Sequence, residues 1–181
     1  MATEFEPGLV VCLTGPESTG KSTIAEQLAS ALAVPLVPEV AREYLAGRPD
    51  YEQSDLLAIA RAQLAAEQDA LAEGTGLVVC DTDLQVIQIW WEERYAELDP
   101  WLAQALVDRS ARRYLLAVPD LPWEPDPLRE SPHDRERLFR RYRQVLREGA
   151  FPYAEVRGLG RSRFDSALVT VQRWLAEPQQ D

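Results

Sequence analysis

Gly15-Pro16-Glu17-Ser18-Thr19-Gly20-Lys21-Ser22 fits the pattern G-x-x-x-x-G-K-[ST] of a phosphate-binding loop. The loop follows an apolar run, residues 9–14, and precedes a segment in which Ile24, Leu28 and Leu32 recur at helical spacing. A strand, a glycine-rich turn and a helix in this order direct backbone N–H groups and the positive helix end into one hollow. The stretch therefore predicts a strand-loop-helix unit that binds a nucleoside triphosphate.

Each polar residue of the motif has an expected role. Lys21 is expected to place its ammonium between the β- and γ-phosphates, Ser22 to ligate Mg²⁺, and Thr23 to lie near the α-phosphate. The other predicted contacts to ATP within the loop are Gly15, Glu17, Ser18, Thr19 and Gly20. The predicted cofactors are thus ATP and Mg²⁺, with the preference for ATP over GTP left open.

The basic residues are distributed very unevenly between lysine and arginine. Lys21 is the only lysine beside 18 arginines, and it stands at the position where an ammonium contacts phosphates. A guanine-reading Asn-Lys-x-Asp motif needs a second lysine, so the composition argues against a GTPase of the Ras type. The lone lysine therefore supports the phosphate site and excludes one large class of phosphate-loop protein.

Charge, hydropathy and cysteine content argue against further classes of protein. The net charge of −11 argues against sequence-independent binding to nucleic acid, and no apolar run reaches membrane-spanning length. Cys12 and Cys80 lie in apolar runs and are expected to be buried thiols, and with the single His133 they do not suggest a zinc cluster. We expect a cytoplasmic protein with a small-molecule substrate, no nucleic-acid or membrane partner, and an oligomeric state that the sequence leaves open.

Apolar runs alternate with helical patterns along the whole chain, which is typical of a sheet covered by helices on both faces. The predicted fold is α/β, a three-layer P-loop kinase fold with a five-stranded, mainly parallel sheet and a lid, in one domain over residues 1–181. The expected strands are residues 9–14, 36–37, 77–80, 114–118 and 153–156, and the last helix is expected to pack through Phe164, Leu168, Val171 and Leu175.

A proline-rich segment interrupts this alternation. Residues 119–132 contain five prolines, too many for a helix interior or a central strand. An amphipathic helix is expected to follow at about residues 134–148. We assign the lid to residues of about 119–147.

The third expected strand ends in Cys80-Asp81-Thr82-Asp83, where a Walker-B aspartate holds the magnesium shell. Asp81 is the expected metal ligand, and Asp83 either contacts the acceptor or caps the next helix. ATPases of the motor and transporter type usually carry a glutamate after the Walker-B aspartate, but Thr82 stands here. The pattern favours phosphoryl transfer to a bound acceptor over hydrolysis.

A kinase also needs groups that hold and activate the acceptor. Glu39 follows the second expected strand and is predicted to orient or deprotonate the acceptor hydroxyl, with Arg42 positioning the acceptor. Arg129 and Arg135 are the predicted cationic groups of the lid. Tyr44 and Trp123 are the aromatic residues expected to stack on a base.

Four motifs together resemble the nicotinamide riboside kinase domain of NadR-type proteins. They are the phosphate loop, Pro38-Glu39-x-Ala41-Arg42-Glu43-Tyr44, Cys80-Asp81-Thr82-Asp83 and Leu121-Pro122-Trp123-x-x-Asp126-x-Leu128-Arg129. The resemblance spans residues of about 9–176 and implies ATP-dependent phosphorylation of the 5′-hydroxyl of nicotinamide riboside to nicotinamide mononucleotide, a step of NAD salvage. It also implies that Arg129 belongs to a mobile lid and that Arg161 lies in a segment bordering the adenine.

The chain departs from that family in two ways. We expect no nucleotidyltransferase domain beside the kinase domain, and Pro38 stands before Glu39 where an aromatic residue would suit nicotinamide. Two alternatives therefore stay open: a P-loop kinase for another nucleoside or small alcohol, and a non-catalytic nucleotide-binding switch. The choice of Glu39 or Asp81 as the general base is also open.

Overall fold

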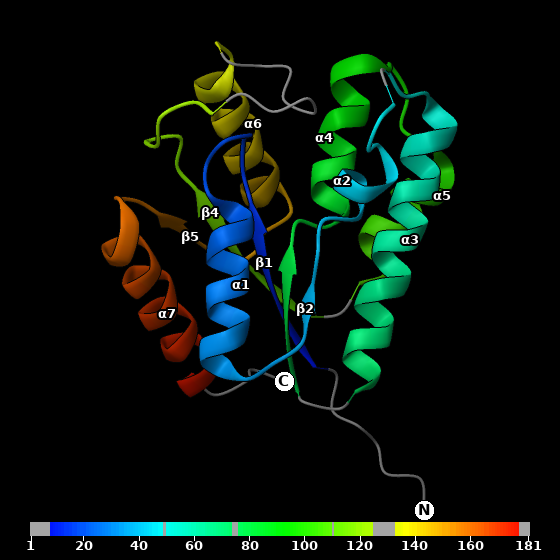
Figure 1. The fold of residues 1–181 in the computed structure, drawn as a ribbon. Helices are drawn as coiled ribbons and strands as arrows, with labels where there is room; N and C mark the ends of the chain where they lie inside the picture. The colour runs from blue at the N-terminus through cyan, green and yellow to red at the C-terminus, as the bar shows by residue number, and fades with distance from the viewer. Residues whose placement is uncertain (1–7, 49, 74–75, 110, 125–132, 178–181) are drawn as a thin grey trace, which may run out of the picture.

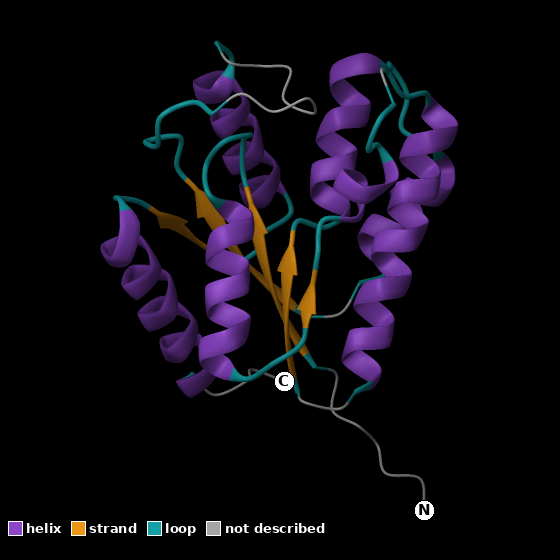
Figure 2. Cartoon of the chain, viewed as in Figure 1, coloured by secondary structure: helices purple, strands orange, loops and turns teal. Residues whose placement is uncertain are grey.

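A computed structural model describes residues 8–48, 50–73, 76–109, 111–124 and 133–177. Five strands form one sheet in the order β2-β3-β1-β4-β5. Their bounds are β1 Leu9–Thr14, β2 Leu36–Val37, β3 Leu77–Asp81, β4 Arg112–Ala117 and β5 Tyr153–Val156. Every neighbouring pair is parallel, and the arrowheads in Figure 2 point to one edge of the sheet. The predicted five-stranded α/β fold is confirmed, and its sheet is fully parallel over the described residues.

Helices cover both faces of the sheet, which gives three layers (Figure 1). Helices α1, Lys21–Leu32, and α7, Gly160–Ala176, pack on one face. Helices α3, Gln53–Ala72, α4, Leu84–Arg94, and α6, Arg135–Glu148, pack on the other. The short helices α2, Val40–Tyr44, and α5, Pro100–Val107, join α3 and α4 in a further apolar cluster.

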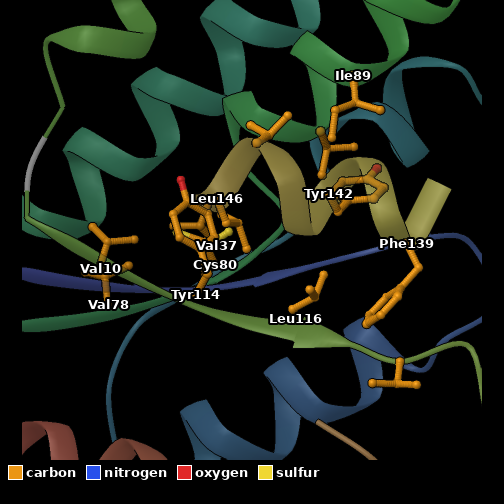
Figure 3. Packing of buried hydrophobic residues seen from close by; sticks show 14 of the residues in the cluster. Val10, Val37, Val78, Cys80, Ile89, Tyr114, Leu116, Phe139, Tyr142 and Leu146 are labelled. Carbon is orange, nitrogen blue, oxygen red and sulfur yellow. The ribbon is translucent and has the colours of Figure 1, made fainter. Parts of the chain in front are cut away.

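The strands read as continuous apolar runs because both of their faces are buried. In β1, Val10 and Cys12 face α3, α4 and α6, whereas Val11 and Leu13 face α1 and α7. Figure 3 shows the first of these clusters, in which Tyr114 of β4 lies among side chains from the neighbouring elements. Both cysteines are fully buried, as predicted.

Helix α6 supplies most of the described residues of the predicted lid. Its Phe139, Tyr142, Val145 and Leu146 belong to the buried cluster on the sheet, and Figure 3 shows Phe139 beside Leu116 of β4. A helix that supplies part of the core packs closely against the sheet. Of the other residues of the predicted lid, 125–132 are outside the described part of the chain, so the lid itself stays a prediction.

The topology places one edge of the sheet in position to bind a ligand. The chain leaves β1 toward β2 on one side, and the later strands β4 and β5 lie on the other side of β1. Ligands of open parallel sheets bind at the carboxyl ends of the strands where the strand order reverses in this way. In the part of the chain that the structure describes, no helix is both long and apolar enough to cross a membrane.

Candidate functional site

The phosphate loop connects β1 to α1 and depends on two glycines. Gly15 has φ +130°, and a Cβ there would lie 2.8 Å from the carbonyl oxygen of Ala117 in β4. Gly20 has φ +74°, and a Cβ there would approach Leu121 Cδ1 to 3.0 Å. The positive φ favours glycine at both positions, and at Gly15 the close approach of the Ala117 backbone also excludes a side chain, whereas Leu121 Cδ1 at Gly20 is the end of a flexible side chain.

The loop is held in shape by hydrogen bonds to its own backbone. Lys21 Nζ and Thr19 Oγ1 each donate to the carbonyl oxygen of Pro16, both at 2.8 Å. Helix α1 begins after Gly20 without a side-chain cap hydrogen bond. The first N–H groups of a helix have no intrahelical acceptor, so this end suits an anion.

Arg163 of α7 supports the loop from behind, and the sequence reasoning missed it. Its side chain is 3% exposed, and its Nη2 donates to the carbonyl oxygens of Thr19 and Val118, both at 2.9 Å. Its Nη1 donates to Asp120 Oδ1 at 2.6 Å, while Asp120 Oδ2 accepts from the Gly158 backbone N–H at 2.8 Å. Arg163 thus joins the phosphate loop to the ends of β4 and β5.

The loop opens into a pocket of about 290 Å³, which residues from outside the loop also line. Ten of the predicted site residues line it together: Gly15, Glu17, Ser18, Thr19, Gly20, Lys21, Ser22, Thr23, Glu39 and Arg42. Apolar residues Val86, Trp90, Leu138 and Tyr142 line the same pocket. The structure therefore brings the phosphate loop and the predicted acceptor residues to one cavity.

Glu39 lies between β2 and α2, at the carboxyl edge of the sheet. Its side chain is 14% exposed, and its Oε2 lies 3.6 Å from Arg42 Nη2 one turn further along the chain. Arg42 is half exposed, so its guanidinium has room to contact a ligand as well as Glu39. The pair places a carboxylate and a cation beside each other in the pocket.

Two aromatic residues of the pocket were not predicted as ligand contacts. Trp90 of α4 lines it, with Tyr51 packed 6.1 Å away between ring centroids. Tyr142 of α6 lines it too, and burial raises the pKa of its hydroxyl, with further contributions from Glu39 and Glu17. Tyr142 therefore stays protonated and can donate a hydrogen bond. Trp90 and Tyr142 follow ordinary helical patterns, so the sequence held no signal that set them apart from packing residues.

The segment after β4 covers the phosphate loop through Ser18 and Arg135. Ser18 Oγ donates to Pro122 O at 3.3 Å and accepts from the Glu124 backbone N–H at 2.9 Å. Arg135 Nη1 donates to Ser18 O at 3.2 Å and to Leu121 O at 2.9 Å. The guanidinium also lies 5.8 Å from the Trp123 ring, which does not itself line the pocket among the described residues. Arg129, the other predicted lid cation, falls outside the described residues.

The carboxyl ends of β1 and β3 carry buried polar atoms that suit a metal shell. Asp81 Oδ1 and Thr14 Oγ1 have no hydrogen-bond partner within the described part of the chain. A buried carboxylate oxygen without a partner is unfavourable unless a ligand or water completes it. Asp81 and the Ser22 hydroxyl of the phosphate loop are oxygen ligands of the kind that Mg²⁺ prefers, so these residues fit the predicted ion.

Asp83 has a structural role, which corrects its assignment to the acceptor. Its Oδ1 accepts from the Gln85 backbone N–H at 2.9 Å and caps α4, as the alternative prediction stated. Its Oδ2 accepts from Arg109, Arg112 and Tyr114 at 2.7, 2.9 and 2.7 Å. Burial opposes ionisation of this carboxyl, but the two arginines outweigh it, so its pKa is lowered. With its side chain 1% exposed and both oxygens engaged, Asp83 is not available to a substrate.

Tyr44 and Arg161, which the sequence predicts as ligand contacts, lie outside the pocket of the phosphate loop. The Tyr44 hydroxyl donates to Asp55 Oδ1 at 3.1 Å, and the Arg48 guanidinium lies 4.5 Å from the Tyr44 ring centroid. The Arg161 side chain is 83% exposed and pairs with Asp165 on its own helix at 2.7 Å. Within the described residues, neither side chain lines the pocket of the phosphate loop.

Comparison with protein families gives one match that covers most of the chain. The profile of the family described as "AAA domain" matches residues 10–163. No curated protein matches the sequence.

Solved structures with a similar fold include two of NadR protein. The chain superposes on NadR protein in complex with NR with a TM-score of 0.78 at 19% identity, over 97% of this chain and 52% of that one. For NadR protein in complex with NAD and AMP-PNP, the TM-score is 0.74 at 19% identity, over 97% of this chain and 51% of that one. The chain thus spans about half the length of these NadR chains.

Thymidylate kinase from Ehrlichia chaffeensis is also similar, with a TM-score of 0.64 at 16% identity, over 93% of this chain and 100% of that one. At such identities the likeness concerns the fold. It confirms the predicted kinase-like P-loop fold and, at the level of fold, the predicted resemblance to NadR-type proteins.

Proposed function

The chain belongs to the AAA domain family, and from this membership and its kinase-like fold we propose that it is an ATP-dependent phosphotransferase. The acceptor in this proposal is the 5′-hydroxyl of nicotinamide riboside, which would become nicotinamide mononucleotide. The observation that carries the proposal is the shared pocket: Glu39 and Arg42 line the same cavity as Lys21 and the phosphate loop. Glu39 and Arg42 lie outside the phosphate loop and bring a carboxylate and a cation to it, which are the groups a kinase uses to activate and hold an acceptor hydroxyl.

The proposed reaction is an in-line transfer of the γ-phosphoryl group. A bond forms between the acceptor oxygen and the γ-phosphorus while the bond from that phosphorus to the bridging oxygen breaks, and ADP leaves. The proton of the acceptor hydroxyl passes to the Glu39 carboxylate. Lys21 and the loop N–H groups neutralise charge on the phosphates, and Arg42 holds the acceptor beside Glu39.

Mg²⁺ belongs to this proposal, with Ser22 and Asp81 as the residues that would hold it. The buried Asp81 Oδ1 without a partner among the described residues supports this assignment. When bound, the ion would supply positive charge to the phosphate oxygens. Arg135, at the start of α6, donates to the backbone of Ser18 and is the proposed cation beside the phosphate loop, and Arg129 remains the predicted cation of the lid.

The acceptor subsite that we propose consists of Trp90, Tyr142 and the apolar Val86 and Leu138. These side chains line the same pocket as Glu39 and Arg42 and would contact the ring of a nucleoside. Because the pyridinium ring of nicotinamide riboside is cationic, contact with an indole face favours it electrostatically. In this proposal Trp90 stacks on the acceptor ring, the role that the sequence predicts for Tyr44 and Trp123.

A second candidate is a kinase for another nucleoside or nucleotide. The fold similarity to thymidylate kinase favours it, because it extends over the whole of that chain, whereas about half of each NadR chain is covered. The phosphate site would be the same in both cases, and only the acceptor subsite would differ.

A coupled assay of ADP release separates these functions. We expect nicotinamide riboside to stimulate ADP release well above the rate in water, with phosphorylated product seen by mass spectrometry. Stimulation by a different nucleoside alone would transfer the proposal to that acceptor. No stimulation by any acceptor, together with tight ATP binding, would favour a nucleotide-binding switch instead.

A further inference from the structure

Gln63 of α3 contacts the backbone on both sides of Glu39. Its Oε1 accepts from the Val40 backbone N–H at 3.0 Å, and its Nε2 donates to the Pro38 carbonyl oxygen at 3.3 Å. The side chain comes from a helix that lies beside α2 in Figure 1 and is 23 residues further along the chain than Val40. The Gln63 amide therefore bonds to the residues on either side of Glu39, the residue that we propose as the general base for the acceptor hydroxyl.

The chemistry of these two contacts fixes the orientation of the amide. A backbone N–H requires an acceptor and a carbonyl oxygen requires a donor, so only one of the two amide orientations satisfies both. Gln63 is 3% exposed, and a polar side chain so deeply buried costs free energy unless it is paired. The two hydrogen bonds thus hold Gln63 in one position relative to α2.

The segment that Gln63 contacts packs through Ala41 in the apolar cluster of α2 to α5, but the start of α2 lacks a side-chain cap. Helix α2 has five residues, and Glu39 at its N-cap makes no side-chain cap hydrogen bond. A helix this short is not stable by itself, and the N–H of its first residue has no acceptor within the helix. Gln63 supplies that acceptor, so it replaces the missing N-cap.

From this geometry we infer that Gln63 is a positioning residue for Glu39, which it keeps directed into the pocket of the phosphate loop. The inference rests on the proposed function, because it assigns Gln63 a role in transfer to the acceptor. Gln63 does not line the pocket among the described residues, so it acts through the backbone of residues 38–40. Its loss should affect the acceptor step and spare ATP binding.

The first test measures the backbone contact without any reaction. Gln63→Met keeps the size of the side chain and removes both hydrogen bonds. We expect the Val40 amide to exchange with deuterium at least about 10-fold faster, since it loses its acceptor. Gln85→Met is the matched control, because Gln85 is also 3% exposed but bonds within the cluster of Gln88 and Arg109. Unchanged exchange at Val40 would overturn the inference.

The second test is a double-mutant cycle with Glu39→Gln, read in the ADP-release assay. Gln63→Met should lower kcat about 10-fold with KM for ATP within two-fold of wild type, and Gln85→Met should not. In the Glu39→Gln background, Gln63→Met should lower kcat little further. The effects of substituting two residues that act through one group do not add. A full 10-fold effect in that background, or an equal effect of Gln85→Met, would reduce Gln63 to a general stabilising residue.

Gln63→Glu provides a partial rescue. Burial favours the neutral carboxylic acid, which keeps an oxygen for the Val40 N–H and a hydroxyl that can donate to Pro38, so the kcat of this variant should lie between those of wild type and Gln63→Met. If wild type shows no acceptor-stimulated ADP release, the proposed function fails, and the exchange of Val40 still decides whether Gln63 holds this segment.

Discussion

Gly15 and Gly47 both have a positive φ, but their surroundings differ. A Cβ at Gly15 would meet the backbone of Ala117 at 2.8 Å, whereas a Cβ at Gly47 has no atom within 4 Å. Gly47→Ala should therefore cost only the strain of the left-handed conformation, about 1–2 kcal/mol. Gly15→Ala adds a backbone overlap that no rotamer relieves, and we expect a loss of about 3 kcal/mol or more in unfolding free energy.

Urea unfolding of the two variants checks this difference, and a fluorescent ATP analogue checks nucleotide binding. Gly47→Ala should bind like wild type, and Gly15→Ala should bind weakly even where it is folded. Equal stabilities of the two variants would contradict the close packing of Gly15 against β4.

We expect Lys21 to contribute to the proposed reaction far more than to the fold. Its Nζ bonds only to the loop carbonyl of Pro16 in the described contacts. Lys21→Ala should lower kcat by about 10²-fold or more, because it removes a charge aimed at the transferred phosphoryl group, and should change unfolding free energy by less than about 0.5 kcal/mol. Lys21→Arg should also fail, since a planar guanidinium is larger than an ammonium. The ADP-release assay and urea unfolding measure both effects, and near-wild-type turnover of Lys21→Ala would refute its role.

Helix α4 begins at a buried ionic cluster formed by Asp83, Arg109, Arg112, Glu67 and Tyr114. Asp83→Asn keeps a capping side chain and removes the charge between two arginines, which should cost about 3–5 kcal/mol. Because the pKa of Asp83 is lowered in the folded state, its contribution is present above the unfolded pKa of about 3.9 and is lost as pH falls further. The stability gap between wild type and Asp83→Asn should therefore be constant from about pH 8 to pH 5 and shrink below about pH 4. Urea unfolding across that range measures the gap, and a gap that closes between pH 8 and pH 6 would contradict the assignment.

Helix α7 offers a test of the support behind the phosphate loop. Arg163→Met should weaken ATP binding about 10-fold or more, because Thr19 and Val118 lose a shared donor. Arg173→Met, an exposed residue of the same helix, is the control and should bind ATP normally. Isothermal titration calorimetry gives both affinities, and equal affinities would show that the loop keeps its shape without Arg163.

The same helix shows where sequence patterns reach their limit. Three residues of the predicted stripe, Phe164, Leu168 and Val171, pack in or against the core as predicted, but Leu175 is 47% exposed, and the buried face also includes Ala167 and Trp174. Arg163 lies four residues before Ala167 on the buried face, so a charged residue in an apolar stripe was the available signal. Likewise, β4 begins two residues earlier than predicted, because Arg112 is buried by its ion pairs with Asp83 and Glu67.

For the molecule as a whole, ATP should stabilise the folded state by mass action. At an ATP concentration of 100 times Kd, the expected gain is about 2.7 kcal/mol. For a chain of this size that corresponds to a rise in Tm of about 5–10 °C. Thermal unfolding with ATP and with AMP measures it. AMP lacks the groups that the phosphate loop binds and should give a much smaller rise, and equal shifts would place the nucleotide elsewhere.

The fold of the whole chain could be predicted because β1, the phosphate loop and α1 are local in sequence. The acceptor side of the site could be predicted only in part. Glu39 and Arg42 follow a strand directly, but Trp90 and Tyr142 reach the pocket from α4 and α6, far apart in the chain. The sequence leaves open whether Asp83 contacts the acceptor or caps the next helix, and only the positions of Arg109 and Arg112 show that its carboxylate is already satisfied.

The single lysine gives this protein an unusual chemical simplicity. Lys21 is the one side chain in the sequence that amine-directed reagents can modify. The α-amino group of the chain is the other amine that they reach. Reductive methylation with isotope-labelled formaldehyde would therefore place one side-chain reporter inside the phosphate pocket. Because the Lys21 ammonium now bonds to the Pro16 carbonyl, a ligand that replaces this partner would shift one resolved magnetic resonance signal, without any engineered label.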